Sequence, residues 1–196
     1  MPIDILIFGG RRAGVVPLVT EAFDWDHGVF LGATASSETT AANIGTVGTL
    51  RRDPFAMQPF CGYNMADYFQ HWFEMGDRLG SKAPRIFYVN WFRKTPEGRW
   101  LWPGYGENSR VLKWMCERID GKVGARWTPI GLLPNEEDLD LTGLHIEPDH
   151  LRELLRVDVN AWRAEIPDIE RYFAQFGDRL PQRLRYQLHA LQARLG

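Results

Sequence analysis

The sequence predicts an α/β fold of the mixed α+β kind, with a central mixed sheet, flanking helices and a helical C-terminal tail. Short apolar runs bounded by glycine and proline stand in the first half of the chain and indicate strands. Amphipathic helical patterns follow one another from Glu147 to Gly196. The length of 196 residues suits one domain, which we divide into an α/β part, 1–146, and a helical tail of the same domain, 147–196.

The composition is that of an ordinary globular protein, with 44% hydrophobic and 24% charged residues. A net charge of -2 implies no polyanion-binding surface, so we expect no nucleic-acid partner. The apolar runs are too short to span a bilayer, so we expect no membrane contact. The two cysteines, Cys61 and Cys116, are too few for a disulfide framework and too far apart for a C-x-x-C site, which fits a reducing cytoplasm.

The first third of the chain alternates apolar runs with glycine-rich turns. "IDILIFGG", Ile3 to Gly10, predicts a buried strand, and Pro17 is expected to lead into a helical turn. "HGVFLGATA", residues 27–35, is apolar, partly β-branched and bounded by glycine, which predicts a second strand. Residues 36–50 are small, polar and glycine-rich, which predicts a loop or mobile flap, and residues 51–64 are irregular.

The middle of the chain predicts a helix followed by a strand. Residues 64–79 place Met, Tyr, Phe and Trp side chains at helical spacing, with Asn64 as the N-cap. "PRIFYVNWF", residues 84–92, is the strongest strand pattern in the sequence. Its near-continuous apolar character predicts burial on both faces of the sheet.

Helices are predicted in the rest of the chain. Residues 109–122 form one helical pattern, for which Asn108 or Ser109 would be the N-cap. Pro148 can open a helix at the start of the tail. Two longer amphipathic stretches complete the tail, and Pro167 would kink or split the first of them.

The segment from Asn90 to Arg110 combines turn residues with large aromatic side chains. Its aromatic residues are Trp91, Phe92, Trp100, Trp102 and Tyr105. Such residues usually pack in a core, here on short strands joined by the turns. Alternatively, they wall a slot for a flat group such as a nucleotide base. Stacking does not distinguish bases, so a selective slot also needs a polar group at the base edge, and Asn108 could supply it. The residue types alone leave both alternatives open.

"FGGRRAG", residues 8–14, is a candidate anion-binding turn. The glycine pair places Arg11 and Arg12 at the carboxyl end of the first predicted strand, a common ligand position in α/β sheets. The planar guanidinium suits phosphate or carboxylate, although a solvated turn with surface arginines would have the same sequence. The turn is not a P-loop, because the G-x-x-x-x-G-K-[ST] pattern occurs nowhere in the 196 residues.

Other polar segments carry weaker signals. Residues 36–48 could order over a ligand as a lid, or could be a plain exposed loop. Asp24, Asp26 and His27 match no standard metal-ligand spacing, so His27 is interpreted as a hydrogen-bonded turn histidine. The acidic stretch 136–150 lacks the glycine position and glutamate spacing of a calcium-binding loop and is interpreted as solvated.

Taken together, these stretches resemble the C-terminal part of GTP-dependent phosphoenolpyruvate carboxykinase. "FGGRRAGVVPLV", "DPFAMQPFCGYN", "VNWFRK", "WLWPGYGENSRVLKWM" and "TPIGLLP" appear in order and with family-like spacing. The resemblance covers nearly the whole chain and is weakest from Glu147 onward. "GTVGTLRRDP" is more similar to bacterial or archaeal members than to vertebrate ones.

The resemblance implies an activity and a set of residue roles. The family interconverts oxaloacetate and GTP with phosphoenolpyruvate, carbon dioxide and GDP in gluconeogenesis, using Mn²⁺ at the active site and Mg²⁺ with the nucleotide. By this resemblance Arg11 would contact the nucleotide phosphates and act catalytically, and Phe60 would line the active site. The guanine pocket would comprise Trp91, Phe92, Trp100, Tyr105, Gly106, Glu107 and Asn108. Trp100 and Tyr105 replace the phenylalanine of many members but keep a flat face.

A mobile lid is also implied, with Ser37 and Glu38 at its hinge. Its other residues would be Thr39, Thr40, Ala41, Ala42, Asn43, Ile44, Gly45, Thr46, Val47, Gly48 and Thr49. Closing such a lid excludes water and protects a reactive enolate from protonation. By the resemblance, lid and guanine pocket both fall in the α/β part, 1–146.

A complete family member has about three times this length, and the missing part carries the P-loop, the manganese ligands and the substrate-binding arginines. Two hypotheses therefore remain. The chain is a carboxykinase fragment that supplies the guanine pocket, Arg11 and the lid, and is inactive without its N-terminal portion. Alternatively, it is a stand-alone domain with weak guanine-nucleotide affinity or no ligand. Its expected partners are oxaloacetate, phosphoenolpyruvate, guanine nucleotide and the missing N-terminal portion.

Overall fold

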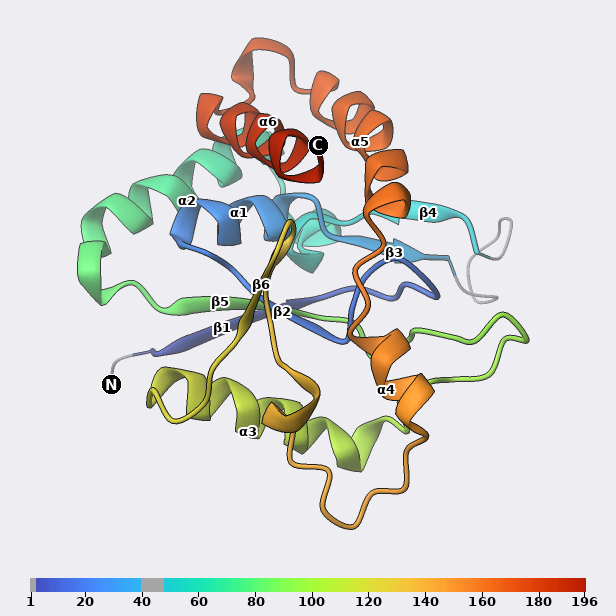
Figure 1. Cartoon of the computed structure of the whole chain (residues 1–196). Helices are drawn as coiled ribbons and strands as arrows, with labels where there is room; N and C mark the ends of the chain where they lie inside the picture. Colours follow the sequence, from blue (N-terminus) through green and yellow to red (C-terminus); the bar gives the residue numbers. More distant parts are fainter. Residues whose placement is uncertain (1–2, 40–47) are drawn as a thin grey trace.

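The computed structural model describes residues 3–39 and 48–196 and shows a mixed α/β fold around one twisted sheet (Figure 1). The main sheet has five strands, in the order β1 (Ile5–Gly9), β5 (Arg85–Val89), β2 (Val19–Glu21), β7 (Gly131–Leu133) and β6 (Arg126–Thr128). β1 runs parallel to β5, and the other pairs are antiparallel. A separate antiparallel pair comprises β3 (Ser36–Glu38) and β4 (Leu50–Arg52). The mixed central sheet predicted from the sequence is confirmed.

Helices cover both faces of the sheet (Figure 1). One face carries α1 (Trp25–Ala33), α2 (Met65–Leu79), α5 (Val159–Ala174) and α6 (Gln182–Leu195), and the other carries α3 (Asn108–Ile119) and α4 (Pro148–Leu154). The short 3₁₀ helices are η1 (Pro54–Ala56), η2 (Gln58–Phe60), η3 (Gly80–Lys82), η4 (Tyr105–Glu107), η5 (Glu136–Asp138) and η6 (Gly177–Arg179). The predicted helical tail therefore packs on both faces of the sheet.

β5 joins the two faces, because its side chains alternate between them. Ile86 approaches α1, while Phe87 and Val89 belong to the core under α3 and α4. The ring of Phe87 meets Trp114 of α3 edge-on, with 5.9 Å between centroids. The strand is buried from Ile86 to Val89, which confirms the two-sided burial predicted from its continuous apolar run.

Several predicted helix boundaries are confirmed. The Asn64 side chain accepts a hydrogen bond of 2.9 Å from the Ala66 amide and so caps α2. Pro148 is the first residue of α4. Pro167 lies inside α5 and does not split it. For α3, however, Glu107 occupies the N-cap position without a side-chain cap, and Asn108 is already the first helical residue.

The predicted strand at residues 27–35 is wrong, because this stretch belongs to helix α1. Asp24 caps the helix by accepting a 2.8 Å hydrogen bond from the His27 amide. Gly28 and Gly32 let α1 lie close to its neighbours, since an added Cβ would meet Ile86 or Phe55 at 2.4 Å. A short apolar run alone does not distinguish a buried strand from a buried helix. Here the Asp24 cap and the two glycines, four residues apart on one helix face, favour the helix.

The predicted helical turn after Pro17 is also wrong. Val19 and Thr20 instead pair with Val89 and Tyr88 of β5 in strand β2. No sequence pattern indicated β6 and β7, which are three residues each and joined by a tight turn. Strands this short carry too little of the two-residue period to be recognised.

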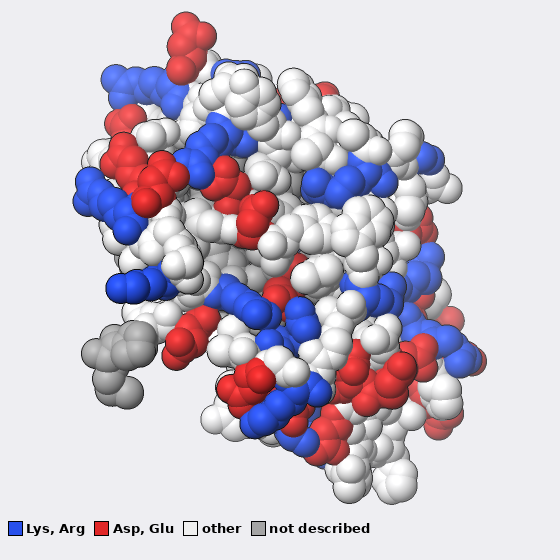
Figure 2. Space-filling model, turned by 60° about the vertical axis from the view of Figure 1, so that its left-hand side comes forward, with Lys and Arg blue, Asp and Glu red and all other residues white. Residues whose placement is uncertain are grey.

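On the face drawn in Figure 2, basic and acidic side chains are interspersed, in keeping with the net charge of -2. Within residues 3–39 and 48–196, no helix has the length and hydrophobicity needed to cross a membrane.

His27 is buried in α1, with 1% of its surface exposed, rather than lying in a turn. Its Nδ1 accepts a hydrogen bond of 3.1 Å from the Phe23 amide, and its ring stacks on Phe23. Burial and, to a smaller extent, the positive charge of Arg194 lower the pKa of His27 to about 3. The imidazole is therefore neutral in the folded protein over the physiological pH range.

This neutral histidine predicts a loss of stability in mild acid. In the unfolded chain His27 protonates near pH 6.5, so the unfolded state binds the extra proton first and folding weakens as pH falls from 6.5 toward 3. Between pH 7 and pH 5 the contribution is about 2 kcal/mol of unfolding free energy. Urea unfolding at both pH values should show a flatter pH dependence for His27→Gln than for the unaltered chain, and equal pH dependence of the two would contradict the assignment.

Candidate functional site

The side chain of Asn90, at the carboxyl end of β5, organises the candidate site. It is fully buried, and its Oδ1 accepts hydrogen bonds from the backbone amides of Arg12 at 3.1 Å and Phe92 at 3.2 Å. Its Nδ2 donates to the carbonyls of Arg12 and Val16, both at 2.9 Å. One side chain thus fixes the turn after β1 and the start of the aromatic segment against each other.

Arg11 lies in this turn and faces the aromatic segment. Its guanidinium carbon is 5.2 Å from the centroid of the Phe92 ring, which allows a cation–π contact. Its Nη1 donates to the carbonyl of Glu38 at 3.2 Å, and its backbone amide donates to Ser37 Oγ at 3.0 Å. The Glu38 carboxylate accepts a 2.7 Å hydrogen bond from the Ala13 amide. The two residues of the predicted hinge therefore hold the Arg11 turn in place.

Gly10 makes this close packing possible. A Cβ at this position would meet the carbonyl oxygen of Ser36 at 2.1 Å and the hydroxyl of Tyr88 at 2.4 Å. Only glycine lets the turn after β1 lie this close to β3. The glycine pair of "FGGRR" is thus explained by the approach of two backbone segments.

A shallow cavity of about 270 Å³ opens at this point. Arg11, Ser37, Trp91 and Phe92 line it, together with Gly9, Gly10 and Val89. It lies where β1 and β5, the parallel pair, both end at their carboxyl termini, the edge at which α/β sheets commonly bind ligands. The structure therefore brings together four residues that the sequence placed in the site.

The aromatic segment folds back on itself as a short hairpin beside this cavity. Lys94 and Trp100 form an isolated antiparallel bridge, and the Leu101 amide donates to the Arg93 carbonyl at 3.0 Å. The Trp100 ring meets Phe92 edge-on at 5.8 Å, and Lys94 Nζ lies 4.1 Å from the Trp100 ring centroid. Trp100 is 53% exposed, so one aromatic surface beside the cavity is accessible.

Arg93, at the base of this hairpin, binds to α4. Its side chain is 1% exposed and donates to Glu153 at 2.7 Å and to the carbonyl of Arg156 at 3.0 Å. Desolvation lowers the pKa of Arg93, and the negative charge of Glu153 opposes this change. Breaking such a buried pair would leave an uncompensated charge, so the tail fixes the aromatic hairpin in position.

The remaining predicted residues lie outside the cavity. Tyr105 is 97% exposed at the start of η4, and Phe60 is 74% exposed at the end of η2. Glu107 pairs with Arg110 one turn ahead, and Gly106 accepts a hydrogen bond from Ser109. Trp102 is buried, as a core residue should be, and its indole donates a 2.9 Å hydrogen bond to Asn108 Oδ1.

The predicted lid lies only partly within the described residues. Ser37 and Glu38 belong to β3, which pairs with β4, and Thr39 exchanges backbone hydrogen bonds with Thr49 and Gly48. The two ends of the predicted lid thus lie side by side. The rest of it, Thr40 to Val47, falls outside the part of the chain that the structure describes.

A buried ion-pair network joins both hinge strands to α5. Glu165 accepts from Arg12 at 2.5 Å and from Arg52 of β4 at 3.3 Å. Arg52 also pairs with Asp168 at 2.6 Å, and Arg12 donates to Ser36 Oγ of β3 at 2.9 Å. Neither this network nor the role of Asn90 was predicted from the sequence. Arg12 and Glu165 are 153 positions apart, and no local pattern relates residues at that separation.

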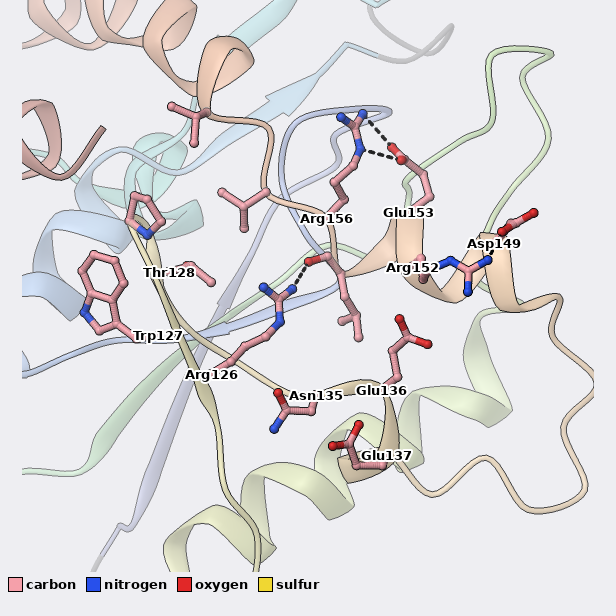
Figure 3. A pocket seen from close by; sticks show the side chains of 14 residues that line it. Arg126, Trp127, Thr128, Asn135, Glu136, Glu137, Asp149, Arg152, Glu153 and Arg156 are labelled. Atoms are coloured by element: carbon pink, nitrogen blue, oxygen red, sulfur yellow. Dashed lines mark hydrogen bonds and ion pairs between the residues drawn. The ribbon is translucent and has the colours of Figure 1, made fainter. Parts of the chain in front are cut away.

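A larger cavity lies elsewhere, between the β6–β7 hairpin and α4, and measures about 750 Å³ (Figure 3). Its polar groups are mostly satisfied within the protein: Arg126 donates to the Leu155 carbonyl, and Arg156 pairs with Glu153. No residue of the predicted site lines it. Among the described residues, no cluster of three His, Cys, Asp or Glu side chains could hold a metal ion.

The chain matches a known family over almost its full length. The model of the phosphoenolpyruvate carboxykinase C-terminal P-loop domain matches residues 1–194. The phosphoenolpyruvate carboxykinase [GTP] of Treponema pallidum (strain Nichols) is 54% identical over 198 residues, covering 100% of this chain and 32% of the relative. That of Arthrobacter sp. (strain FB24) is 52% identical, covering 97% and 31%. That of Paenarthrobacter aurescens (strain TC1) is 50% identical, covering 97% and 32%.

These matches define the class of protein. The fold is an α/β domain with a cavity of about 270 Å³ at the carboxyl ends of its parallel strands. The chain belongs to the phosphoenolpyruvate carboxykinase family, in its GTP-dependent branch, and spans about a third of the length of the relatives it matches. The resemblance inferred from "FGGRRAG" and "WLWPGYGENSRVL" is thereby confirmed.

Asn90 provides a direct test of how the site is held. Replacing it with alanine removes four hydrogen bonds and leaves buried amides and carbonyls of Arg12, Phe92 and Val16 without partners. We expect Asn90→Ala to lower the unfolding free energy by more than about 3 kcal/mol in urea titrations. Asn64→Ala, which removes one helix-cap bond, should cost about 1 kcal/mol. Equal losses for the two variants would show that Asn90 is not an organising residue.

Proposed function

We propose that this chain is the guanine-nucleotide-binding part of a phosphoenolpyruvate carboxykinase, which converts oxaloacetate and GTP into phosphoenolpyruvate, GDP and carbon dioxide. The observation that carries the proposal is the cavity at the ends of β1 and β5. There a guanidinium, Arg11, lies beside aromatic faces, Trp91 and Phe92, and beside the hinge residue Ser37. A nucleotide needs both a cation for its phosphates and a flat surface for its base.

Arg11 would supply the positive charge for phosphoryl transfer. Its guanidinium can hold two phosphate oxygens and offset the charge that develops on the transferred group. Mn²⁺ and nucleotide-bound Mg²⁺ would add further charge neutralisation in the whole enzyme. Their ligands, the P-loop and the substrate-binding arginines would come from the N-terminal portion of a cytoplasmic enzyme of gluconeogenesis. Phe60 would line the active site that the two portions form together.

The aromatic hairpin would hold the base. Trp91 and Phe92 line the cavity, and Trp100 contacts the Phe92 ring. Tyr105 is almost fully exposed and is accessible to pack against a bound base. Gly106, Glu107 and Asn108 would face the base edge. The residues from Thr39 to Thr49 would close over the nucleotide and exclude water, with the β3–β4 pair as their base.

A stand-alone domain with weak or no nucleotide affinity is the second candidate function. It is favoured by the absence of a P-loop pattern from the 196 residues, because backbone amides of such a loop supply most phosphate contacts. The two candidates differ in what the chain does when the rest of a carboxykinase is added.

Nucleotide titration tests the proposed base slot. Tryptophan fluorescence should change with millimolar GDP and much less with ADP, because Trp91 lines the cavity and Trp100 contacts Phe92, which also lines it. Asn108→Ala should weaken GDP binding by about tenfold, the cost of one unmade hydrogen bond at the base edge. No response to GDP, or an equal response to ADP, would contradict a preformed guanine slot in this chain.

The free edge of β1 is where the rest of a carboxykinase would dock. β1 has one neighbour, β5, in the described sheet. The backbone amide of Arg85 donates to the Asp4 carbonyl, and that of Gly10 donates to the Val89 carbonyl. In a parallel ladder with these bonds, the backbone N–H and C=O groups of Ile5 and Ile7 point away from β5. Ile7 is 43% exposed. Within the described strand, residues 5–9, no charged residue, proline or bulge interrupts this edge, so it is suited to receive another strand.

Co-expression tests this docking. The preceding two-thirds of the Treponema relative, carrying an affinity tag, should retain this chain on a column and yield carboxykinase activity with Mn²⁺, GTP and oxaloacetate. Ile7→Lys should reduce retention by at least tenfold, because it places a charge on the docking edge. Tyr186→Lys, at an exposed position of α6, is the matched control. Undiminished retention of the Ile7→Lys chain, or turnover by this chain alone, would refute the proposal.

A further inference from the structure

The hydrogen bond between Trp102 and Asn108 determines how the amide of Asn108 is oriented. The Trp102 side chain is 1% exposed and held in the core formed by β5, α3 and α4. An indole N–H can only donate, so the atom of Asn108 that lies 2.9 Å from it must be the oxygen, Oδ1. The alternative orientation would place two donors, the indole N–H and the Asn108 NH₂, against each other.

This orientation leaves the Asn108 NH₂ group available. Within the described part of the chain no protein atom accepts a hydrogen bond from Nδ2, and the side chain is half-buried at the first turn of α3. The neighbouring carboxylate of Glu107 is held by Arg110 and does not capture the NH₂ group. Asn108 therefore presents a donor, and not an acceptor, to a ligand at the end of the aromatic segment.

We propose that Trp102 is a specificity-determining positioning residue: by fixing Oδ1 of Asn108, it makes the site select purines that carry an oxygen at position 6. A 6-oxo group accepts a hydrogen bond from the NH₂ group, whereas the 6-amino group of adenine is itself a donor and would meet it unfavourably. The inference rests on the proposed nucleotide function and deepens it. It assigns selectivity to a buried residue that does not touch the base.

With Oδ1 held by Trp102, Asn108 offers the base only a hydrogen-bond donor, whereas a freely rotating asparagine could offer either a donor or an acceptor. An unrestrained amide can rotate by half a turn and offer its oxygen to adenine, so it would discriminate poorly. The bond from the buried Trp102 indole holds Oδ1 and so prevents this rotation. The same bond satisfies the indole N–H, which would otherwise be buried without a partner. The fixed amide is thus preorganised before any nucleotide arrives.

The nucleotide selectivity of the unaltered chain and of two variants tests the proposal. GDP, IDP and ADP are titrated against the chain, since IDP shares the 6-oxo group of GDP and lacks its 2-amino group. The unaltered chain should bind GDP and IDP at least tenfold more tightly than ADP. Trp102→Phe should reduce this preference to less than about threefold, because the amide can then rotate. Asn108→Asp, which offers an acceptor in place of the NH₂ group, should favour ADP.

A matched control addresses loss of packing. Trp114 lies in the same core and is fully buried, and its indole N–H has no hydrogen-bond partner in the described residues. Trp114→Phe should therefore weaken the fold as much as Trp102→Phe while keeping the preference for 6-oxopurines. Equal loss of selectivity in both variants would overturn the proposal and show that core packing alone sets it.

A spectroscopic measurement tests the hydrogen bond without any nucleotide. The indole N–H resonance that disappears in Trp102→Phe should shift, and exchange faster with solvent, in Asn108→Ala. An unmoved resonance would overturn the inference whatever the chain binds. If the resonance moves and the unaltered chain prefers GDP and IDP, but Trp102→Phe keeps that preference, the role of Trp102 is refuted and the nucleotide function stands. Equal binding of all three nucleotides by the unaltered chain would refute both.

Discussion

The buried amide of Asn90 is the interaction on which the candidate site depends. Its oxygen and nitrogen each make two hydrogen bonds, and these reach the Arg12 turn, the entry to β2 and the start of the aromatic segment. Asn90 thereby fixes three irregular segments relative to one another at the end of β5, which is buried from Ile86 to Val89. The distance between Arg11 and Phe92 follows from this bond pattern. Asn90 binds the backbone amide of Phe92 and the amide and carbonyl of Arg12, which is the neighbour of Arg11.

Buried charges extend this frame to the C-terminal helices. Arg93 reaches α4 through Glu153, and Arg12 and Arg52 reach α5 through Glu165. Ion pairs of this kind add little net stability, but they fix geometry, because a displaced partner leaves a desolvated charge. The tail therefore contributes to the site without lining it: α4 supports the aromatic hairpin, and α5 supports the strands that flank residues 40–47.

Local signals allowed the sequence to predict much of the fold. The continuous apolar run of β5, the Asn64 cap and the opening proline of α4 each depend on a few adjacent residues, and all three are confirmed. The error at α1 arose because an apolar run was weighed without its cap and without the spacing of Gly28 and Gly32, which share one helix face. Asn90 and Glu165 could not have been found, since their partners are defined only by the folded chain.

Each of the two alternatives for the aromatic segment, core packing and a slot for a base, fits a different part of it. Leu101 and Trp102 belong to the core, whereas Trp100 and Tyr105 remain exposed and Phe92 lines the cavity. Trp102 connects the two, because its ring fills the core while its N–H holds Asn108. A core residue can thus set the hydrogen-bonding character of a surface residue. The turn-rich sequence between Asn90 and Arg110 is consistent with this arrangement, because glycines and prolines permit the irregular backbone on which buried and exposed aromatic residues follow one another.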